Sequence, residues 1–465
     1  MDTPVSAFKK VDSGEDAFLF ESVEGSEKWG RYSFIGVGSR IVFRNKGDNI
    51  EIIEGDKVIN KKGAPLSILQ EILARFTPVE VMGLPRFYGG AVGYIGYDMV
   101  RFFEHLPDTS KRDVDIYDSV FLITQSLLIF DNLEQKIKVV YNAVIDDKPE
   151  KVYREAIEKI DGIVDRLKSP ASKTSQESKV KSQEVKETAL SSNFSREGFL
   201  NAVLKAKEYI KAGDVIQVVL SQRFNTKLDV EPFDIYRSLR VVNPSPYMFY
   251  MRLDGLELIG SSPEILVRVE GKDIDVRPIA GTRPRGKTID EDKNLEHDLL
   301  NDPKEIAEHI MLVDLGRNDI GRVSQTGTVD VNEFMTVERY SHVMHIVSNV
   351  HGKLEDDKNS FDAVRACFPA GTLTGAPKVR AMEIIEELEP CKRGAYGGSV
   401  GYFGFSGTMD MAITIRTLVI KDNNIYVQAG AGIVADSIPE NEYQETINKA
   451  KAMLKAVELA REGLE

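Results

Sequence analysis

The first third of the chain alternates short apolar runs with residues at helical spacing. The predicted strands are 17–20, 41–43, 49–53, 57–59, 120–130 and 137–144, with turns at Gly55-Asp56 and Asp131-Asn132. Apolar residues recur every three or four positions over 66–76 and 152–167, which predicts two amphipathic helices. The segment 88–97 is rich in glycine and aromatic residues, which indicates closely packed strands rather than a phosphate-binding loop.

Residues 169–192 interrupt this pattern, because they are polar and have no apolar period. We interpret them as an exposed linker or long loop. The sequence therefore predicts an N-terminal part over 1–168 and a larger C-terminal part over 193–465.

The C-terminal part again mixes strands and helices, without a strict alternation of the two. The predicted strands are 215–220, 247–253, 256–261, 265–269, 328–331, 345–350, 399–403, 411–419 and 424–429. The predicted helices are 199–210 (ended by Gly213), 231–241, 303–315, 361–367, 376–388 and 439–462. This order favours an α+β fold over a doubly wound one.

Composition excludes several classes of function. The chain has 465 residues and a net charge of -13, which argues against a general nucleic-acid binder. Its two cysteines, Cys367 and Cys391, form no disulfide framework or CxxC metal pattern. No stretch is apolar for long enough to span a bilayer, and residues 1–4 do not begin a targeting leader. We therefore expect a cytoplasmic protein without membrane contact.

Two pairs of glutamates occur near predicted helix starts. Glu305 and Glu308 are three positions apart, and so are Glu442 and Glu445, which puts each pair on one helix face. Asp302 is a good N-cap with Glu305 at the third position, so a capping box explains Glu305 without further chemistry. Either pair alone is typical of a solvated face, but together they would suit Mg²⁺ if the fold brings them close.

Histidines and cations form further candidate groups, each with a structural alternative. His342 and His345 are three positions apart, and one of them could be a general acid, although a core or loop histidine explains either. The stretch 369–378 can form an anion site at a helix start beside Lys378, or an ordinary turn. Arg416 is predicted inside an apolar strand and needs an anionic partner, either a substrate carboxylate or an internal salt bridge.

Two smaller features complete this set. Arg283 follows Gly281-Thr282 and adds a third cation. Residues 430–432 (Gly-Ala-Gly) follow a predicted strand and could present backbone N–H groups to an anion, or form a plain turn.

Taken together, the motifs resemble those of the chorismate-utilising enzymes, and within them the large subunits of anthranilate synthase. They are RPIAGTR at 277–283, LVDLGRND at 312–319, ERYSHVMH at 338–345, PAGTLTGAPK at 369–378, GSVGYFG at 398–404 and PENEYQE at 439–445. This resemblance is specific over about 195–462 and weaker at 19–22 and 31–36. It implies two β-sheets packed face to face with helices outside, with chorismate as substrate and Mg²⁺ as cofactor.

The resemblance also implies roles for individual residues. Glu308 and Glu445 would bind the metal, supported by Glu305 and Glu442, and the metal would hold the ring carboxylate of chorismate. The other substrate contacts would be Arg416, Tyr396, Gly430, Gly432, Thr282 and Lys378. The catalytic residues would be His345 as general acid, Thr372 to place the ring and Glu264 as a base or to orient ammonia.

Two positions discriminate within the family that the chain resembles. Aminodeoxychorismate synthases commonly carry a nucleophilic lysine where this chain has Ala280, and isochorismate and salicylate synthases carry a lysine base where it has Gln217. Both differences favour anthranilate synthesis. The alternatives are an aminodeoxychorismate synthase without that lysine and a non-catalytic homologue that senses tryptophan, which the intact acidic pairs argue against.

The resemblance finally implies a partner and an inhibitor. No glutaminase nucleophile elbow surrounds either cysteine, so a separate glutamine amidotransferase subunit, in a heterotetramer, would supply ammonia. Glu21, Ser22, Pro246, Tyr247 and Met248 match the family's site for feedback inhibition by tryptophan. Without the resemblance, a proline-rich turn into a strand would explain the second of these segments.

Overall fold

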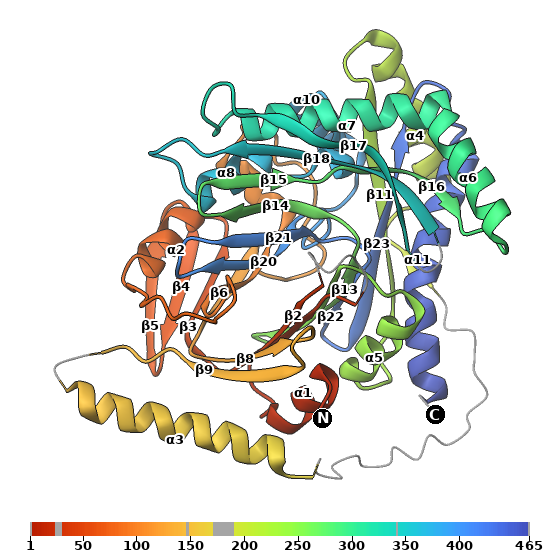
Figure 1. The fold of residues 1–465 in the computed structure, drawn as a ribbon. Coiled ribbons are helices and arrows are strands. Elements are labelled where there is room, and N and C mark those ends of the chain that lie inside the picture. The colour runs from red at the N-terminus through yellow and green to blue at the C-terminus, as the bar shows by residue number, and fades with distance from the viewer. Residues whose placement is uncertain (1, 24–29, 146–147, 171–189, 341–342, 464–465) are drawn as a thin grey trace.

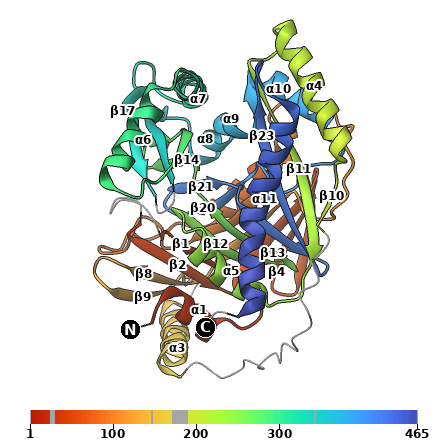
Figure 2. The same ribbon diagram turned by 90° about the vertical axis from the view of Figure 1, so that its right-hand side faces the viewer.

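Two large antiparallel β-sheets form the body of the molecule, and helices cover their outer faces (Figures 1 and 2). The computed structural model describes residues 2–23, 30–145, 148–170, 190–340 and 343–463. This arrangement confirms the predicted α+β fold of two face-to-face sheets with outer helices.

The first sheet runs in the order β10-β11-β23-β22-β13-β12-β1-β2-β8-β9, with β19 beside β11. Its strands are β1 (Ala17–Glu21), β2 (Tyr32–Val37), β8 (Ser126–Asp131), β9 (Lys136–Tyr141), β10 (Ser191–Ser192), β11 (Gln217–Lys227), β12 (Tyr247–Leu253), β13 (Leu256–Ser262), β19 (Gly375–Ala376), β22 (Thr417–Lys421) and β23 (Asn424–Ile433).

The second sheet runs in the order β16-β18-β15-β14-β21-β20-β6-β7-β3-β4-β5, with β17 beside β18. Its strands are β3 (Ser39–Lys46), β4 (Asn49–Glu54), β5 (Lys57–Lys62), β6 (Gly90–Ile95), β7 (Ser119–Thr124), β14 (Ile265–Glu270), β15 (Asp273–Val276), β16 (Ile279–Pro284), β17 (Asp330–Arg339), β18 (Val343–Lys353), β20 (Ser399–Gly404) and β21 (Met409–Ile413).

The helices agree closely with the predicted ones where the apolar period is strong. They are α1 (Pro4–Val11), α2 (Pro65–Leu73), the 3-10 helix η1 (Tyr97–Phe102), α3 (Pro149–Lys168), α4 (Arg196–Ala212), α5 (Pro232–Val242), α6 (Ile289–Asn301), α7 (Pro303–Gly321), α8 (Ser360–Cys367), α9 (Gly371–Thr374), α10 (Lys378–Leu388) and α11 (Pro439–Glu462). Gly213 ends α4 with a φ of 85°, as predicted from its freedom to adopt left-handed backbone. Sequence reasoning missed α6, because this helix is mostly charged and buries only Asp292 and Leu299.

The side chains of β1 show how each sheet buries both faces. Phe18 lies in a cluster between the two sheets, with Phe249 of β12 and Tyr402 of β20. Its neighbours Ala17 and Leu19 point the opposite way, into a cluster under α1, α5 and α11. Because successive strand residues alternate faces, a strand covered on both sides is apolar at every position. This is why β1 gives an unbroken apolar run in the sequence.

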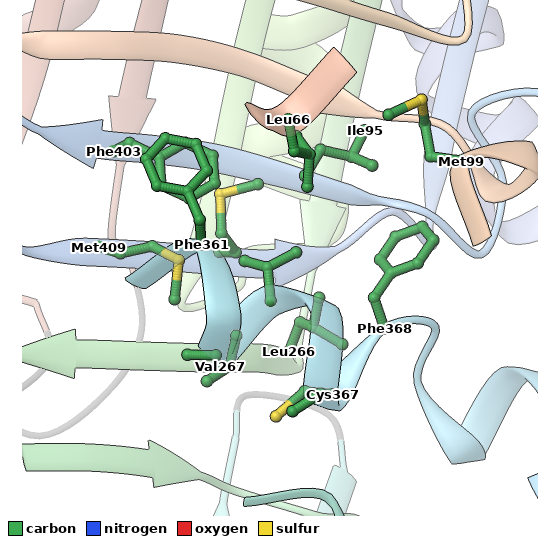
Figure 3. Close-up of a cluster of buried hydrophobic side chains, with 14 of the residues drawn as sticks. Leu66, Ile95, Met99, Leu266, Val267, Phe361, Cys367, Phe368, Phe403 and Met409 are labelled. Atoms are coloured by element: carbon green, nitrogen blue, oxygen red, sulfur yellow. The ribbon is translucent and has the colours of Figure 1, made fainter. Parts of the chain in front are cut away.

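A second outer cluster lies where α2 and α8 cover the second sheet (Figure 3). Phe361 of α8 stacks on Phe403 of β20, with ring centres 4.2 Å apart. Gly93 of β6 allows close strand packing, since a Cβ there would lie 1.9 Å from the carbonyl oxygen of Val120. The glycines of the 88–97 segment therefore have the structural role that the sequence indicated.

Two predicted strands are wrong in the same way. Residues 120–130 form β7 and β8, and residues 411–419 form parts of β21 and β22, with each pair divided between the two sheets. The chain crosses between sheets at Gln125 and at 414–416, where no glycine or proline marks a break. An apolar run shows that a segment is buried, but it does not show in which sheet.

Strands from both sides of the predicted linker are interleaved in both sheets. In the first sheet β1, from the N-terminal part, pairs with β12, and in the second β6 pairs with β20. The division at 169–192 stays a prediction about sequence segments, and residues 171–189 of that linker lie outside the described residues. In the described parts of the chain, no helix combines the length and apolarity needed to cross a membrane.

Candidate active site

Arg416 lies in the short connection between β21 and β22, not inside a strand, which corrects the prediction. β21 ends at Ile413 and β22 begins at Thr417, and Arg416 has a φ of 49°, in the left-handed region that arginine rarely adopts. Its carbonyl oxygen accepts a hydrogen bond from the N–H of Ser261 (3.0 Å).

The guanidinium of Arg416 has no carboxylate partner among the described residues. Burial lowers its pKa, and no acidic group opposes this. A desolvated cation without a counterion is costly unless an anion binds it. Of the two partners considered from the sequence, an internal salt bridge is not formed, which leaves a ligand anion.

His345 of β18 lies within electrostatic reach of Arg416 and is fixed by β16. Its Nδ1 donates to the carbonyl oxygen of Gly281 (2.9 Å) and lies 3.1 Å from Oγ1 of Thr282. Because a carbonyl only accepts, Nδ1 carries the proton and Nε2 is left for a ligand. Burial lowers the pKa of His345, the bond to Gly281 opposes this, and the charge of Arg416 lowers the pKa further. The other predicted histidine, His342, lies outside the described residues.

The first acidic pair lies at the start of α7, next to the strand that holds His345. Asp302 caps α7 by accepting from the N–H groups of Lys304 and Glu305. The carboxylate of Glu305 accepts from Arg283 (3.2 Å), which takes the place of the return bond of a capping box. Glu308 accepts from Nε2 of Gln217 at 3.2 Å. Arg283 is bound by acidic residues of α6 and α7, so its charge is balanced within the protein.

The second acidic pair lies at the start of α11. Glu445 forms an ion pair with Lys449 (2.7 Å), which also donates to the carbonyl oxygen of Gly430. Burial raises the pKa of Glu442, and the negative charge of Glu445 raises it further, whereas the charge of Lys304 on α7 lowers it. The starts of α7 and α11 therefore lie within electrostatic reach of each other. No three acidic, histidine or cysteine side chains in the described parts of the chain form a ready metal cluster.

Gly430 and Gly432 belong to β23, and so do not form a turn after a strand. They pair with Ser221 and Val219 of β11. A Cβ at position 430 would lie 2.7 Å from the hydroxyl of Tyr396, and one at 432 would lie 2.4 Å from Nε2 of Gln217. Since only glycine avoids both collisions, the backbone of β23 is kept open between Tyr396 and the Gln217–Glu308 pair.

Thr372 and Glu264 lie together on the next wall of the site. Thr372 is in α9, which contacts α7 and β11 (Figure 2). Its buried hydroxyl lies within reach of the carboxyl of Glu264. Both residues line a cavity of about 50 Å³. Burial raises the pKa of Glu264 to about 8, although Thr372 opposes this rise.

Lys378 is bound by neighbouring groups of the protein. Its ammonium forms an ion pair with Asp319 (2.8 Å) and donates to the carbonyl oxygen of Cys367. Its charge is therefore compensated inside the protein, in contrast to that of Arg416. Of the cations named from the sequence, the structure leaves Arg416 as the one suited to a ligand.

A second and larger cavity, of about 430 Å³, lies between β1, β12, β14 and β21. Its lining includes all the residues predicted for an effector: Glu21, Ser22, Pro246, Tyr247 and Met248. The carboxylate of Glu21 is already bound by the hydroxyl of Tyr236 (2.5 Å) and by Arg240.

Sequence reasoning missed the polar floor of this larger cavity. Arg268 and Asp410 form an ion pair there, with 2.6 Å between Nη2 and Oδ2, and the hydroxyl of Tyr247 donates to Asp410. The available signal was a single charged residue inside each of two apolar strands.

Comparisons with known proteins find relatives over almost the whole chain. A family model described as "chorismate binding enzyme" matches residues 17–455. Anthranilate synthase component 1 of Acetivibrio thermocellus is 51% identical over 464 residues, with 99% of this chain and 94% of the relative covered. The corresponding protein of Aquifex aeolicus is 53% identical, with 100% and 94% covered.

Two solved structures share the fold. Anthranilate synthase component I from Streptococcus pneumoniae superposes with a TM-score of 0.81 at 39% identity, covering 91% of this chain and 92% of that one. The menaquinone-specific isochorismate synthase MenF from Escherichia coli has a TM-score of 0.73 at 20% identity, covering 98% and 91%. At that identity, the second likeness concerns the fold alone.

Proposed function

This chain belongs to the family of chorismate binding enzymes, and we propose that it is the large subunit of an anthranilate synthase. In the proposed reaction, ammonia adds at C2 of chorismate while the 4-hydroxyl leaves as water. Loss of the C2 proton and of the enolpyruvyl group as pyruvate then gives the aromatic ring of anthranilate.

The observation that carries this proposal is the uncompensated charge of Arg416 beside His345. Chorismate is a dianion, and its enolpyruvyl carboxylate suits a guanidinium that has no partner in the described protein. The hydroxyl of Tyr396 lies beside the backbone of β23 at Gly430, two residues before Gly432. These groups would hold one end of the substrate.

The other carboxylate of chorismate calls for a second positive charge, and Mg²⁺ would supply it. Glu308 and Glu445 would hold the ion, with Glu305 and Glu442 supporting. The donor set fits, because Mg²⁺ prefers carboxylate oxygens and water, and because the repulsion between Glu442 and Glu445 is relieved by a cation. When bound, the ion supplies charge that orients and stabilises the ring carboxylate.

Proton transfers fall to His345 and Glu264. Nε2 of His345, left open by the bond from Nδ1 to Gly281, would protonate the departing 4-hydroxyl. Its lowered pKa requires help from the substrate, whose two negative charges favour the imidazolium. With a pKa of about 8, Glu264 is protonated at neutral pH, so it can act as a base only in alkaline solution. Thr372, next to it, would place the ring.

Two features distinguish amination at C2 from related reactions. Ala280, in β16, has no nucleophile with which to attack the ring. Gln217 donates to Glu308 and, as an amide, cannot take a proton from water. Both support anthranilate over aminodeoxychorismate and isochorismate.

A partner and an effector complete the proposal. A glutamine amidotransferase subunit would supply ammonia in a heterotetramer, since neither cysteine is placed as a glutaminase nucleophile. Tryptophan would bind in the cavity of about 430 Å³ that Ser22, Pro246 and Met248 line, and would inhibit the enzyme.

Anthranilate fluorescence gives the direct test. The purified chain, chorismate, MgCl₂ and ammonium chloride at alkaline pH should produce anthranilate and an equal amount of pyruvate. EDTA should stop the reaction, and excess Mg²⁺ should restore it. An aminated product that retains the enolpyruvyl group by mass spectrometry would make the chain an aminodeoxychorismate synthase. Binding of chorismate without any product would leave a non-catalytic homologue.

A further inference from the structure

A fully buried ion pair lies behind the candidate active site and has no role in the chemistry described so far. Arg393 and Glu389 are 1% and 3% exposed, with 2.6 Å between Nη2 and Oε1. A second bond, from Nε to Oε2 at 2.9 Å, makes the contact bidentate. Such a pair fixes the orientation of the planar guanidinium as well as its position.

The guanidinium also binds two walls of the site through their backbones. Nη1 donates to the carbonyl oxygen of Leu373 at 2.7 Å, and Nη2 donates to that of Val219 at 2.8 Å. Leu373 directly follows Thr372 in α9. Val219 lies in β11, where it pairs with Gly432.

Tyr396 is the third part of the site in contact with this pair. Its N–H donates to the carbonyl oxygen of Arg393 (3.2 Å), and its ring centre lies 5.6 Å from the guanidinium carbon. The ring of Tyr97 lies on the guanidinium as well, at 4.8 Å. The position of the Tyr396 hydroxyl beside Gly430 therefore depends on Arg393.

Glu389 extends the connection along β11. Its Oε1 accepts from both the N–H (2.7 Å) and the hydroxyl (2.9 Å) of Ser221. Ser221 pairs with Gly430 in the strand ladder. The pair thus contacts β11 opposite both of the glycines that keep the site open.

We propose that Arg393 and Glu389 are positioning residues that hold α9, β11 and Tyr396 at the spacing chorismate requires. Stability alone is a poor explanation, because well-packed apolar side chains generally replace a buried ion pair without loss. What apolar side chains cannot replace is a rigid fork that binds a carboxylate and two carbonyl groups at once. This inference rests on the proposed function.

The test compares three variants with a matched control. Arg393→Lys keeps the charge and loses the fork, and Glu389→Gln keeps the volume and loses the charge. Ser221→Ala leaves the ion pair intact and removes the hydroxyl that donates to Glu389 and accepts from Gln428. The control is Arg101→Lys, since Arg101 forms a partly buried pair with Glu386 of α10 and touches none of the three walls. Each protein is assayed with ammonium as nitrogen source, and its melting temperature and tryptophan affinity are measured.

We expect kcat/KM for chorismate to fall by about 100-fold in Arg393→Lys and Glu389→Gln, mostly through KM, because a displacement of about 1 Å in a site has this effect. Ser221→Ala should lose about fivefold. Tryptophan affinity should stay within about twofold of wild type in every folded variant, because the effector cavity does not touch the pair.

Two results would overturn the proposal. One is a lowered melting temperature with KM and kcat unchanged, which would make the pair structural. The other is an equal loss in Arg101→Lys, which would make the effect unspecific. If Arg393→Lys and Glu389→Gln do not fold, Ser221→Ala decides, and wild-type KM in that variant counts against the proposal. A wild-type chain that makes no anthranilate would instead refute the proposed function.

Discussion

At the scale of single residues, Arg416 shows a conflict between stability and binding. Its guanidinium is desolvated without a counterion in the described protein, and its backbone adopts a left-handed conformation. Both features cost free energy, and no contact among the described residues offsets that cost. A bound substrate carboxylate would offset it, so a substitution of this residue gives a clear prediction.

Arg416→Gln should weaken catalysis without weakening the fold. We expect kcat/KM for chorismate to fall by about 10² to 10³, the cost of removing one partner from a charge-assisted contact. The melting temperature should stay the same or rise, because the variant no longer buries an unpaired charge. Arg317→Gln, at an exposed arginine of α7, is the control and should change neither quantity. A large drop in melting temperature would show that Arg416 has a structural partner.

Glu264 should make stability depend on pH. Its pKa is raised to about 8 in the fold, against about 4.5 when unfolded, so the folded protein binds one more proton between these values. The stability due to the protonated carboxyl is complete below about pH 4.5 and is lost as the pH rises to about 8, by about 3–5 kcal/mol. Glu264→Gln should lack this loss, so its stability relative to wild type should increase from pH 5 to pH 8.5 in denaturant titrations.

The control for this measurement is Glu155→Gln, at an exposed position of α3, which should follow wild type at both values. A constant difference between Glu264→Gln and wild type would mean that Glu264 is ionised in the fold throughout.

The roles of single residues were the hardest feature to predict from the sequence. Spacing alone indicated the acidic pairs, but it left His345 and Arg416 with equally good structural explanations. Only the resemblance of whole motifs selected them. Arg393 was not selected by either approach. Its pairing with Glu389 four positions earlier is ordinary on a sequence, and its contacts to the site are carbonyl groups at Val219 and Leu373, which carry no side-chain signal.

At the scale of elements, the starts of two helices define the proposed metal site. Glu305 lies in the first turn of α7 and Glu442 in the first turn of α11, where a helix favours negative charge, and Glu308 and Glu445 follow three residues later. The charge of Lys304 on α7 acts on Glu442 of α11, so the two starts lie within electrostatic reach of each other, and α9 and β11 connect them by contact. A cation bound there would connect two helices that otherwise repel each other.

Mg²⁺ should therefore stabilise the folded chain in the absence of substrate. At a concentration about 100 times its dissociation constant, the gain is about 2.7 kcal/mol, visible as a rise in melting temperature. Glu308→Gln and Glu445→Gln should lose this rise and the Mg²⁺-dependent turnover, whereas Glu458→Gln, exposed on the same α11, should keep both. Full activity in the first two variants would place the metal elsewhere.

Helices and strands were predicted well where turn residues or a regular apolar period mark their ends. They were predicted poorly where the chain crosses from one sheet to the other. The hairpin of β4 and β5 and the limits of α11 agree with the sequence, because turn residues or an apolar period mark them. The connections at Gln125 and at 414–416 carry no such mark. The second of these errors affects the site, since it hid the backbone turn that exposes Arg416.

At the scale of the whole molecule, the two cavities are joined by short segments that belong to both. β14 begins next to Glu264 in the site and carries Arg268 into the larger cavity. β21 carries Asp410 into the same cavity and ends at Ile413, three residues before Arg416. A ligand in the larger cavity would therefore contact β14 and β21, and the other ends of these strands adjoin the candidate active site. This arrangement offers a direct physical route for the inhibition by tryptophan that we propose.

The shortest connection runs through the turn before β12. Ser245, next to the cavity residue Pro246, donates to the carbonyl oxygen of Ser262, and the hydroxyl of Ser262 bonds the backbone of Glu264. In parallel, Asn243 donates to the hydroxyl of Ser261 (2.7 Å), whose N–H binds the carbonyl oxygen of Arg416. A shift of residues 243–246 on tryptophan binding would thus reach both residues of the site.

Ser245→Ala should separate tryptophan binding from inhibition. The Ser245 hydroxyl donates to Ser262 and does not line the larger cavity. The dissociation constant for tryptophan should therefore stay within about twofold of wild type, as measured by calorimetry without chorismate. The tryptophan concentration for half inhibition should rise by about tenfold, since coupling between sites is typically worth 1–3 kcal/mol. Ser238→Ala, which removes a buried hydroxyl bonded only within α5, should leave both values unchanged. A parallel rise of both values in Ser245→Ala would show that this hydroxyl shapes the cavity rather than connecting it to Glu264.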